Sequence, residues 1–491
     1  MCYNLPRRKV AQMKYLFCFV GGLLAFGSAG APVAADGDAP VFAPDGSVLF
    51  QRPRGEFLDV MRADASLGNA KTVASAENMS FGQPAVGPEG EVVCVGYSLA
   101  QTSYQKAIAK SDDGANLYLV KGGVTRRLTW GRQFDSTPSF GPDGKVYYSS
   151  ADISTTRGVP GLFRIDPKQE KPVRETLYLA PAYHSTGVSQ PVVSPDGRFL
   201  AWTELDGWDD TWSLRLSRLE DRTSPCTLTP VKMWAYAPRW CPDSRHLVFT
   251  GFRTGDPTWC VYVIDVKTGA WTRLFAGTEP CVSADGRTIV YSKEGVLKTA
   301  PFARPDASAA VAGALPWEEP EKVLLAQENV SNDTLIDLDE TFAFGRDKTA
   351  FVRVAFEYDK DASQLQSLAR LVYGESAYGL HLYLGKGQPH FATRDGLNAH
   401  FRIATGTTFK ASRGVMTGVR TAEGIFLFVE GDKSFTSVYQ KRFSRDCLAL
   451  LTPKALAVGT RLTDSHVTKV EVGTGWPTNV PKPFNVREAF K

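Results

Sequence analysis

The sequence has little net charge, few histidines and few cysteines, and each shortage argues against a class of function. The formal net charge is +4, and positions 1–35 hold four basic residues and no acidic one, so the rest of the chain has no formal net charge. Such a chain has no global attraction to nucleic acid or to an anionic membrane. Its six histidines and eight cysteines form no CxxC pair and no Cys/His cluster with zinc spacing, so neither a metal site nor a cofactor is predicted.

Long hydrophobic runs are also scarce, and the apolar run near the start, Tyr15 to Phe26, is too short to span a membrane comfortably. Basic residues precede it, and small residues ending in Val33-Ala34-Ala35 follow. This order is typical of a cleaved secretory signal peptide. We therefore predict a signal over residues 1–35, no transmembrane segment after cleavage, and export to the periplasm, the cell surface or the medium of a bacterium. Export permits disulfides, and at most one bridge is expected among the four cysteines between residues 226 and 281.

A turn of the Pro-Asp-Gly type occurs six times in the first 290 residues. The acidic residue of each turn lies 44, 54, 53, 47 and 42 residues before that of the next copy, a period typical of one four-stranded propeller blade. Every copy opens with a proline, runs through a short apolar strand into the turn, and ends in a second strand. The copies are Pro40–Phe50, Pro84–Cys94, Pro138–Tyr148, Pro191–Ala201, Pro238–Val248 and Pro280–Val290.

The chemistry of this unit supports a propeller. Proline fixes φ, the acidic residue caps the turn, and glycine takes the left-handed position. The strands that follow are rich in β-branched and aromatic residues. We predict a six-bladed β-propeller over residues 36–325. The repeats resemble the PD40 repeats of the TolB family of periplasmic proteins, a resemblance that implies the fold and, among functions, the docking of a protein partner.

The last third of the chain has a different all-β pattern. Residues 350–356, 378–384 and 424–429 alternate as half-buried strands do. We predict a two-sheet β-sandwich over residues 326–491. Together with the strand-turn segment Phe426–Lys433, this order resembles a laminin-G or concanavalin-type jelly roll, which implies glycan binding or support of a neighbouring domain. The histidines at 381, 390 and 400 are not spaced as a metal site and are expected to be hydrogen-bonded surface residues.

Propellers place function at one mouth of the central channel, where the loops after each second strand and the connections between blades meet. Arginines there can hold a carboxylate, aromatic rings can stack on sugars, and two carboxylates can divide acid and base roles. This combination predicts an acidic glycan or glycoprotein as ligand. The predicted substrate-binding residues are Arg52, Arg54, Arg132, Arg157, Arg253, Trp208, Trp234 and His184.

A propeller joined to a lectin-like sandwich also resembles secreted sialidases. That resemblance implies three arginines on the sugar carboxylate, a Tyr/Glu nucleophile pair and an acid/base Asp. The arginines would be Arg54, Arg132 and Arg253. The catalytic residues would be Tyr236 with Glu204, and Asp206 or Asp209. A sialidase Asp box is missing, because Ser194–Trp202 has its Gly and Trp out of place.

The sequence leaves several functions open. The first is a secreted exo-glycosidase of sialidase type that acts on sialylated glycans. The second is a non-catalytic scaffold of the TolB kind or a glycan-binding protein. A metal-dependent polyuronate lyase is less favoured, because the propeller holds only His184 and His246 as histidine ligands. Convergence of the three arginines on one pocket would distinguish the first from the second.

Overall fold

The computed structural model contains two compact units that divide near residue 311. The residues that the structure describes are 36–98, 114–152, 160–179, 187–206, 211–220, 225–229, 233–253, 255–304, 319–342, 344, 348–357, 366–373, 377–385, 388–394, 401–405, 413–421, 424–431, 436–442, 453–460, 462 and 466–480. Within this part of the chain, no helix has the length and apolar character needed to cross a bilayer.

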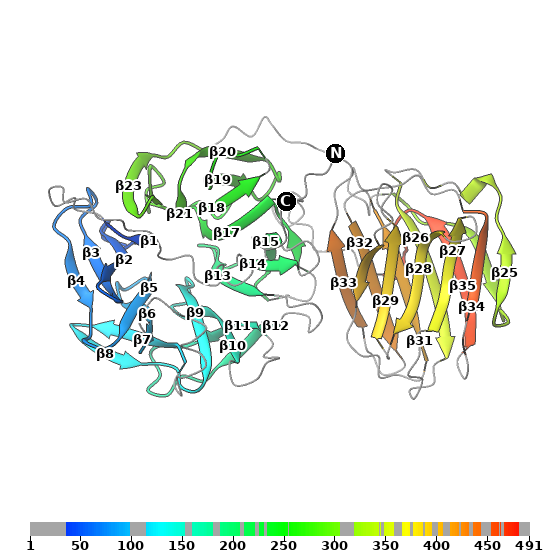
Figure 1. Ribbon diagram of the computed structural model, residues 1–491, viewed down its shortest axis with the longest axis horizontal. Helices are drawn as coiled ribbons and strands as arrows, with labels where there is room; N and C mark the ends of the chain where they lie inside the picture. Colours follow the sequence, from blue (N-terminus) through cyan, green and yellow to red (C-terminus); the bar gives the residue numbers. More distant parts are fainter. Residues whose placement is uncertain are drawn as a thin grey trace. The chain divides into compact units, whose positions relative to one another are not determined.

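The described part of the first unit forms six antiparallel sheets around a common centre, as Figure 1 shows, and this confirms the predicted six-bladed propeller. Five sheets have four strands, and the sixth has three within the described residues. Blades 1 to 3 consist of β1 (Asp38–Phe42), β2 (Val48–Arg54), β3 (Phe57–Ala63) and β4 (Lys71–Ala74); β5 (Ser80–Val86), β6 (Val92–Tyr97), β7 (Asn116–Lys121) and β8 (Val124–Arg127); and β9 (Gln133–Phe140), β10 (Val146–Asp152), β11 (Gly161–Ile165) and β12 (Glu175–Leu179). Blades 4 to 6 consist of β13 (Val188–Val193), β14 (Phe199–Asp206), β15 (Thr211–Arg218) and β16 (Cys226–Thr227); β17 (Met233–Trp240), β18 (His246–Arg253), β19 (Cys260–Asp265) and β20 (Trp271–Ala276); and β21 (Thr278–Val282), β22 (Thr288–Lys293) and β23 (Val296–Pro301).

The repeated turns join the first and second strands of the blades by local bonds. In blade 4, Asp196 Oδ1 accepts hydrogen bonds from Ser194 Oγ (2.5 Å) and Arg198 N (3.1 Å). Gly197 takes the left-handed conformation at φ 74°. Blade 5 places Ser244 at the same position with φ 54°. The turns therefore work as the sequence predicts, and the acidic residue is structural.

Apolar side chains pack between neighbouring blades. Phe50 of blade 1 shares a buried cluster with Val290 and Leu297 of blade 6, which ties the first blade to the last. Asp36 adds a bridge to Val296 at the same seam. The predicted disulfide is absent among the described cysteines, because Cys94, Cys226, Cys241, Cys260 and Cys281 are all free thiols.

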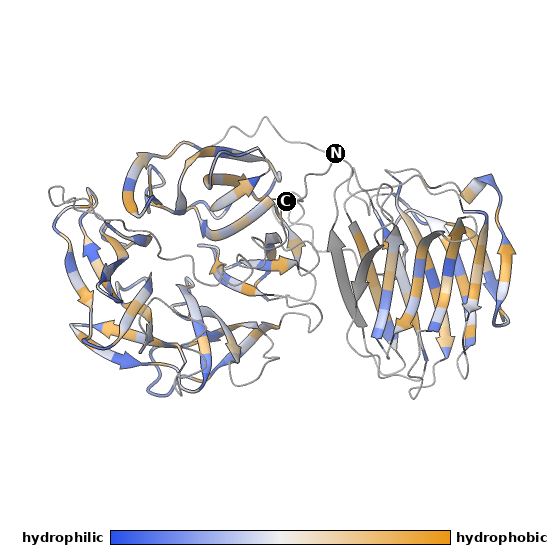
Figure 2. Ribbon diagram, viewed as in Figure 1, coloured by the Kyte–Doolittle hydropathy of each residue, from blue (hydrophilic) through white to orange (hydrophobic). Residues whose placement is uncertain are grey.

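The second unit is a sandwich of two six-stranded sheets. The three predicted strands are present as β26 (Ala350–Glu357), β28 (Ala377–Gly385) and β32 (Gly424–Gly431). Figure 2 shows that hydrophobic and hydrophilic residues alternate along several of these strands. The remaining elements are β24 (Lys322–Glu328), β25 (Thr334–Asp337), a 3-10 turn (Glu340–Phe342), β27 (Gln366–Tyr373), β29 (Gln388–Arg394), β30 (Phe401–Thr405), β31 (Arg413–Arg420), β33 (Thr436–Arg442), β34 (Ala455–Thr460) and β35 (His466–Thr474).

Two details of the sandwich differ from the sequence analysis. Strand β24 pairs with β35, so the sandwich begins before the predicted boundary at residue 326. Two of the histidines expected at the surface are enclosed instead. His390 is buried and stacks on Tyr383, and burial lowers the pKa of His381 to about 3. His400 lies outside the described residues.

Candidate functional site

The innermost strand of each blade carries the same irregularity. The residue before the repeat proline has φ between 49° and 58°, a left-handed conformation that non-glycine residues seldom adopt. A register shift accompanies it in the pairing of every first strand with its second strand. The six residues are Ala39, Gln83, Thr137, Gln190, Ala237 and Glu279.

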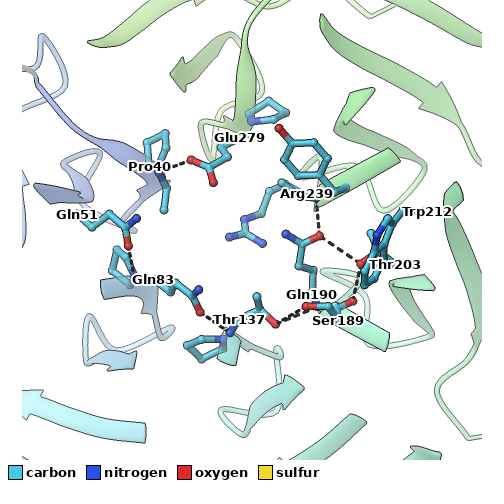
Figure 3. Close-up of a pocket in the computed structure, with 16 residues that line it drawn as sticks. Pro40, Gln51, Gln83, Thr137, Ser189, Gln190, Thr203, Trp212, Arg239 and Glu279 are labelled. Atoms are coloured by element: carbon cyan, nitrogen blue, oxygen red, sulfur yellow. Dashed lines mark hydrogen bonds between the residues drawn. The ribbon is translucent and has the colours of Figure 1, made fainter. Parts of the chain in front are cut away.

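This conformation turns six backbone N–H groups toward the preceding blades, and each finds a side-chain oxygen there. We call the result the channel ring; it closes upon itself around the propeller axis (Figure 3). Its six bonds, donor first, are Ala39 N to Glu279 Oε2 (2.6 Å), Gln83 N to Gln51 Oε1 (2.8 Å), Thr137 N to Gln83 Oε1 (2.6 Å), Gln190 N to Thr137 Oγ1 (2.9 Å), Ala237 N to Gln190 Oε1 (2.7 Å) and Glu279 N to Thr250 Oγ1 (2.7 Å).

Two blades supply the acceptor in a different way. Four left-handed residues carry an acceptor themselves, but Ala39 and Ala237 have none. In those blades the second strand provides it, through Gln51 in β2 and Thr250 in β18. Gly82 makes room for Gln51, because a Cβ atom at Gly82 would lie 2.6 Å from Gln51 Oε1. Each position of the ring therefore requires an acceptor of suitable reach, whether neutral or charged.

The ring surrounds a cavity of about 80 Å³, which the guanidinium of Arg239 enters, as Figure 3 shows. Arg239 follows the repeat proline of blade 5. The equivalent residues of the other blades are small or apolar: Val41, Ala85, Ser139, Val192 and Cys281. Among the residues that the structure describes, no carboxylate oxygen lies within 4.0 Å of the Arg239 guanidinium. Arg239 Nη1 donates a hydrogen bond to the carbonyl oxygen of Pro238 (3.3 Å), and the guanidinium lies in the channel.

Two carboxyl groups stand near this arginine at the seam between the last blade and the first. Burial in the channel wall, together with the charge of Asp38, raises the pKa of Glu279 to about 8, and Arg239 opposes the shift. Burial likewise raises the pKa of Asp38 to about 6, against a hydrogen bond from Gln51. Tyr236 also lines the cavity, and burial raises the pKa of its hydroxyl group.

An aromatic cluster on blade 5 adjoins Tyr236. The ring of Trp259 lies 5.1 Å from Tyr236, 5.3 Å from Phe252 and 6.5 Å from Trp234, measured between ring centres. All four residues are contributed by the start of β17, the end of β18 or the loop after it. Trp212 of blade 4 reaches the cavity as well. The channel thus combines a cation, a polar ring and aromatic side chains.

The predicted pairing of Tyr236 with Glu204 is wrong. Glu204 Oε2 accepts hydrogen bonds from Tyr178 and Trp202, each at 3.2 Å, and lies 3.5 Å from Arg215 Nε. These contacts join blade 4 to the outer strand of blade 3 and leave Glu204 outside the cavity lining. The carboxyl groups whose charges act on the Tyr236 hydroxyl and raise its pKa are those of Glu279 and Asp38, and that hydroxyl is hydrogen-bonded with Thr250.

The predicted arginine triad is not assembled either. Arg54 bonds to Asp59 (2.9 Å) and to the carbonyl of Ala76, so its own hairpin holds it. Arg253 stacks over Trp271 at 4.9 Å. Neither residue lines the cavity, nor do Arg52 and the exposed Arg132. The three predicted arginines therefore do not converge on one pocket, which was the arrangement that would favour a sialidase.

The other predicted residues are placed as follows. Trp234 belongs to the aromatic cluster, and Tyr236 lines the cavity. Asp206 ends β14, but its side chain lies outside the description. Four predicted residues fall outside the described part of the chain: Arg157, His184, Trp208 and Asp209.

Histidine does not supply a metal site in the part of the propeller that is described. His246 Nδ1 lies 2.7 Å from Asp243 Oδ2 within the repeated turn of blade 5. Among all described residues, no three or more His, Cys, Asp or Glu side chains are grouped to hold a metal ion.

Sequence reasoning missed Arg239 because it looked for function only in the loops and the connections between blades; Glu279 lies in such a connection but received no role. Both residues adjoin a repeat proline, so the alignment of the six copies contained the signal. Arg239 is the charged residue among the six that follow the prolines, and Glu279 is the charged residue among the six that precede them. A search for departures from the repeat would have found both.

Comparison with known proteins finds only weak similarities to solved structures. No family model matches the chain, and no curated protein matches it. Among solved structures, a putative TolB from Agrobacterium tumefaciens is 16% identical over 54% of this chain and 90% of its own (TM-score 0.38). A sialidase from Trypanosoma rangeli is 11% identical over 91% of this chain and 92% of its own (TM-score 0.38).

An oligogalacturonate lyase in complex with manganese is also similar, at 14% identity over 54% of this chain and 76% of its own (TM-score 0.39). These similarities are weak. They agree with an all-β propeller architecture and carry no argument about activity, substrate or metal.

Proposed function

We propose that this protein is an exported, non-catalytic propeller that binds acidic glycans, with Arg239 receiving the carboxylate of a sugar. The observation that carries the proposal is the guanidinium of Arg239 in a channel where the other five blades place small or apolar residues. A planar guanidinium matches a carboxylate through two parallel hydrogen bonds. An arginine that the architecture does not need is best explained by a ligand.

The size of the cavity limits what enters it. Pockets that enclose a drug-sized ligand measure roughly 300–1,000 Å³, whereas this cavity measures about 80 Å³. A carboxylate and a few waters fit, and a whole sugar does not. The ring of the sugar would lie at the mouth, where the aromatic cluster of blade 5 offers Trp259 and Trp234 for stacking.

Two further observations favour binding over catalysis. The nucleophile pair and arginine triad expected of a sialidase are not assembled from the predicted residues. Glu279, which lines the same cavity as Tyr236, accepts a hydrogen bond from Ala39 N as one member of the channel ring. A glycan or glycoprotein outside the cell is the partner that we propose, and a protein partner of the TolB kind is the alternative.

Titration calorimetry of the signal-free protein with N-acetylneuraminic acid, glucuronic acid and neutral galactose tests this proposal. We expect the two acidic sugars to bind and the neutral sugar not to bind. Equal affinity for all three, or none for any, would contradict the role of Arg239.

A second candidate is an exo-glycosidase of sialidase type, favoured by Tyr236 and Glu279, which line the same cavity. Fluorogenic sialosides decide between the two candidates. The non-catalytic proposal expects no release of the fluorophore. Release that is lost in Glu279→Gln would establish the enzyme instead.

A further inference from the structure

The charged groups around the channel come from several blades, and few of them can change charge near neutral pH. Tyr97 lies near Asp38, and burial raises the pKa of its hydroxyl group to about 12. Tyr236 and the Cys281 thiol likewise have raised pKa values because of burial. These three groups remain neutral, so the charge of the channel is set by Arg239 together with two carboxyl groups.

Those two carboxyl groups are Asp38 on β1 and Glu279 on β21. Glu279 Oε2 accepts the Ala39 N–H at 2.6 Å, and Asp38 is the next residue before Ala39. Glu279 lines the cavity that Arg239 enters, and Asp38 directly precedes Ala39, which lines the same cavity. Their ionisation therefore changes the electrostatic potential where an anionic ligand would bind.

The channel ring does not require an acid at position 279. Gln83 and Gln190 perform the same task in blades 2 and 4 with neutral amide oxygens, at 2.6 Å and 2.7 Å. Blade 6 uses a titratable acceptor instead, and a second carboxyl stands beside it. The ring requires neither an acid at position 279 nor an arginine at position 239. Their presence side by side indicates that the two residues share a function.

We propose that Asp38 and Glu279 form a proton-controlled gate that admits an anion to Arg239 when both are protonated and repels it when both are ionised. The three groups sum to a charge of +1 in the first state and −1 in the second. Burial raises the pKa of both carboxyl groups, and the charge of Asp38 raises that of Glu279 further, so the change of sign moves toward neutral pH. This inference rests on the proposed function of Arg239 and adds its regulation.

Calorimetry with N-acetylneuraminic acid across about pH 5 to pH 9 tests the gate, because the probe stays ionised throughout. We expect the affinity of the wild-type protein to fall at least about tenfold as pH rises. Glu279→Gln keeps the ring acceptor and should remove the part of the fall near pH 8. Asp38→Asn/Glu279→Gln should bind with the same affinity at every pH.

The outcomes separate the gate from the binding function. A wild-type affinity that does not change with pH, but that is lost in Arg239→Val, leaves the binding site in place and overturns the gate. A fall in affinity that persists in the double variant also overturns it. If the wild-type protein binds the probe at no pH, both the function and its regulation are refuted.

Discussion

The Pro-Asp-Gly turns and the channel ring are both repeated in all six blades, yet different bonds stabilise them. The acidic side chain of a turn bonds within that turn, as Asp196 does to Ser194 and Arg198, although the Asp196 N–H also donates to Ser244 Oγ of blade 5. A position of the ring is held by a side chain of the preceding blade, as Ala237 is by Gln190. Bonds within each repeated turn therefore build the blades, and repeated bonds between neighbouring blades join them into a closed ring.

This difference also separates architecture from function. At the glycine position the turns tolerate one departure, Ser244, which keeps the left-handed conformation. The ring tolerates Ala39 and Ala237 because the second strand supplies the missing acceptor. Arg239 and Glu279 depart from the repeat by their charge, although Glu279 also serves as a ring acceptor. Substitutions at the ring, the gate, the turn and the arginine should therefore have effects of decreasing size on stability.

The largest loss of stability is expected from Gln190→Ala. This substitution removes the acceptor of Ala237 N (2.7 Å) and a partner of Thr203 Oγ1 (3.2 Å). Leaving an enclosed N–H without its partner costs about 1–3 kcal/mol. Denaturant unfolding should show that loss, whereas Gln327→Ala, on an exposed position of β24, should stay within about 0.5 kcal/mol of the wild type. Equal effects would show that the ring adds little to stability.

The second effect depends on pH. Because folding raises the pKa of Glu279 from 4.5 to about 8, the folded state holds this proton more tightly than the unfolded state. Stability is therefore greatest below pH 4.5 for this group and decreases as pH rises to 8. We expect a decrease on the order of 1–2 kcal/mol, because water in the channel screens part of the charge. In Glu279→Gln the unfolding midpoint should change less with pH over this range; an unchanged slope would contradict the assignment.

A smaller loss is expected at the turn. Asp196→Ala removes the bonds to Ser194 Oγ and Arg198 N, but solvent reaches this site and replaces part of them. The free energy of unfolding should fall by about 0.5–1.5 kcal/mol. Asp196→Asn, which keeps one acceptor oxygen, is the matched control and should lose less. A loss larger than that of Gln190→Ala would reverse the comparison between turn and ring.

The same division separates the features that the sequence predicts from those that it does not. The turns were predicted because proline, Asp and Gly act on their own backbone within a few residues. The ring was not, because each bond joins residues of different blades, such as Gln83 and Thr137, and a non-glycine residue before proline is not expected at positive φ. The loop arginines were misjudged because side-chain contacts of the folded state, such as Arg54 with Asp59, decide where they point.

The smallest effect on stability is expected from Arg239→Val, which gives blade 5 the residue that blades 1 and 4 already have. This variant tests the central claim most directly, that Arg239 serves a ligand and not the fold. Calorimetry at about pH 5.5 with N-acetylneuraminic acid should show binding to the wild-type protein and none to the variant. The free energies of unfolding of the two proteins should agree within about 0.5 kcal/mol. Retained binding, or a variant that is strongly destabilised, would contradict the claim.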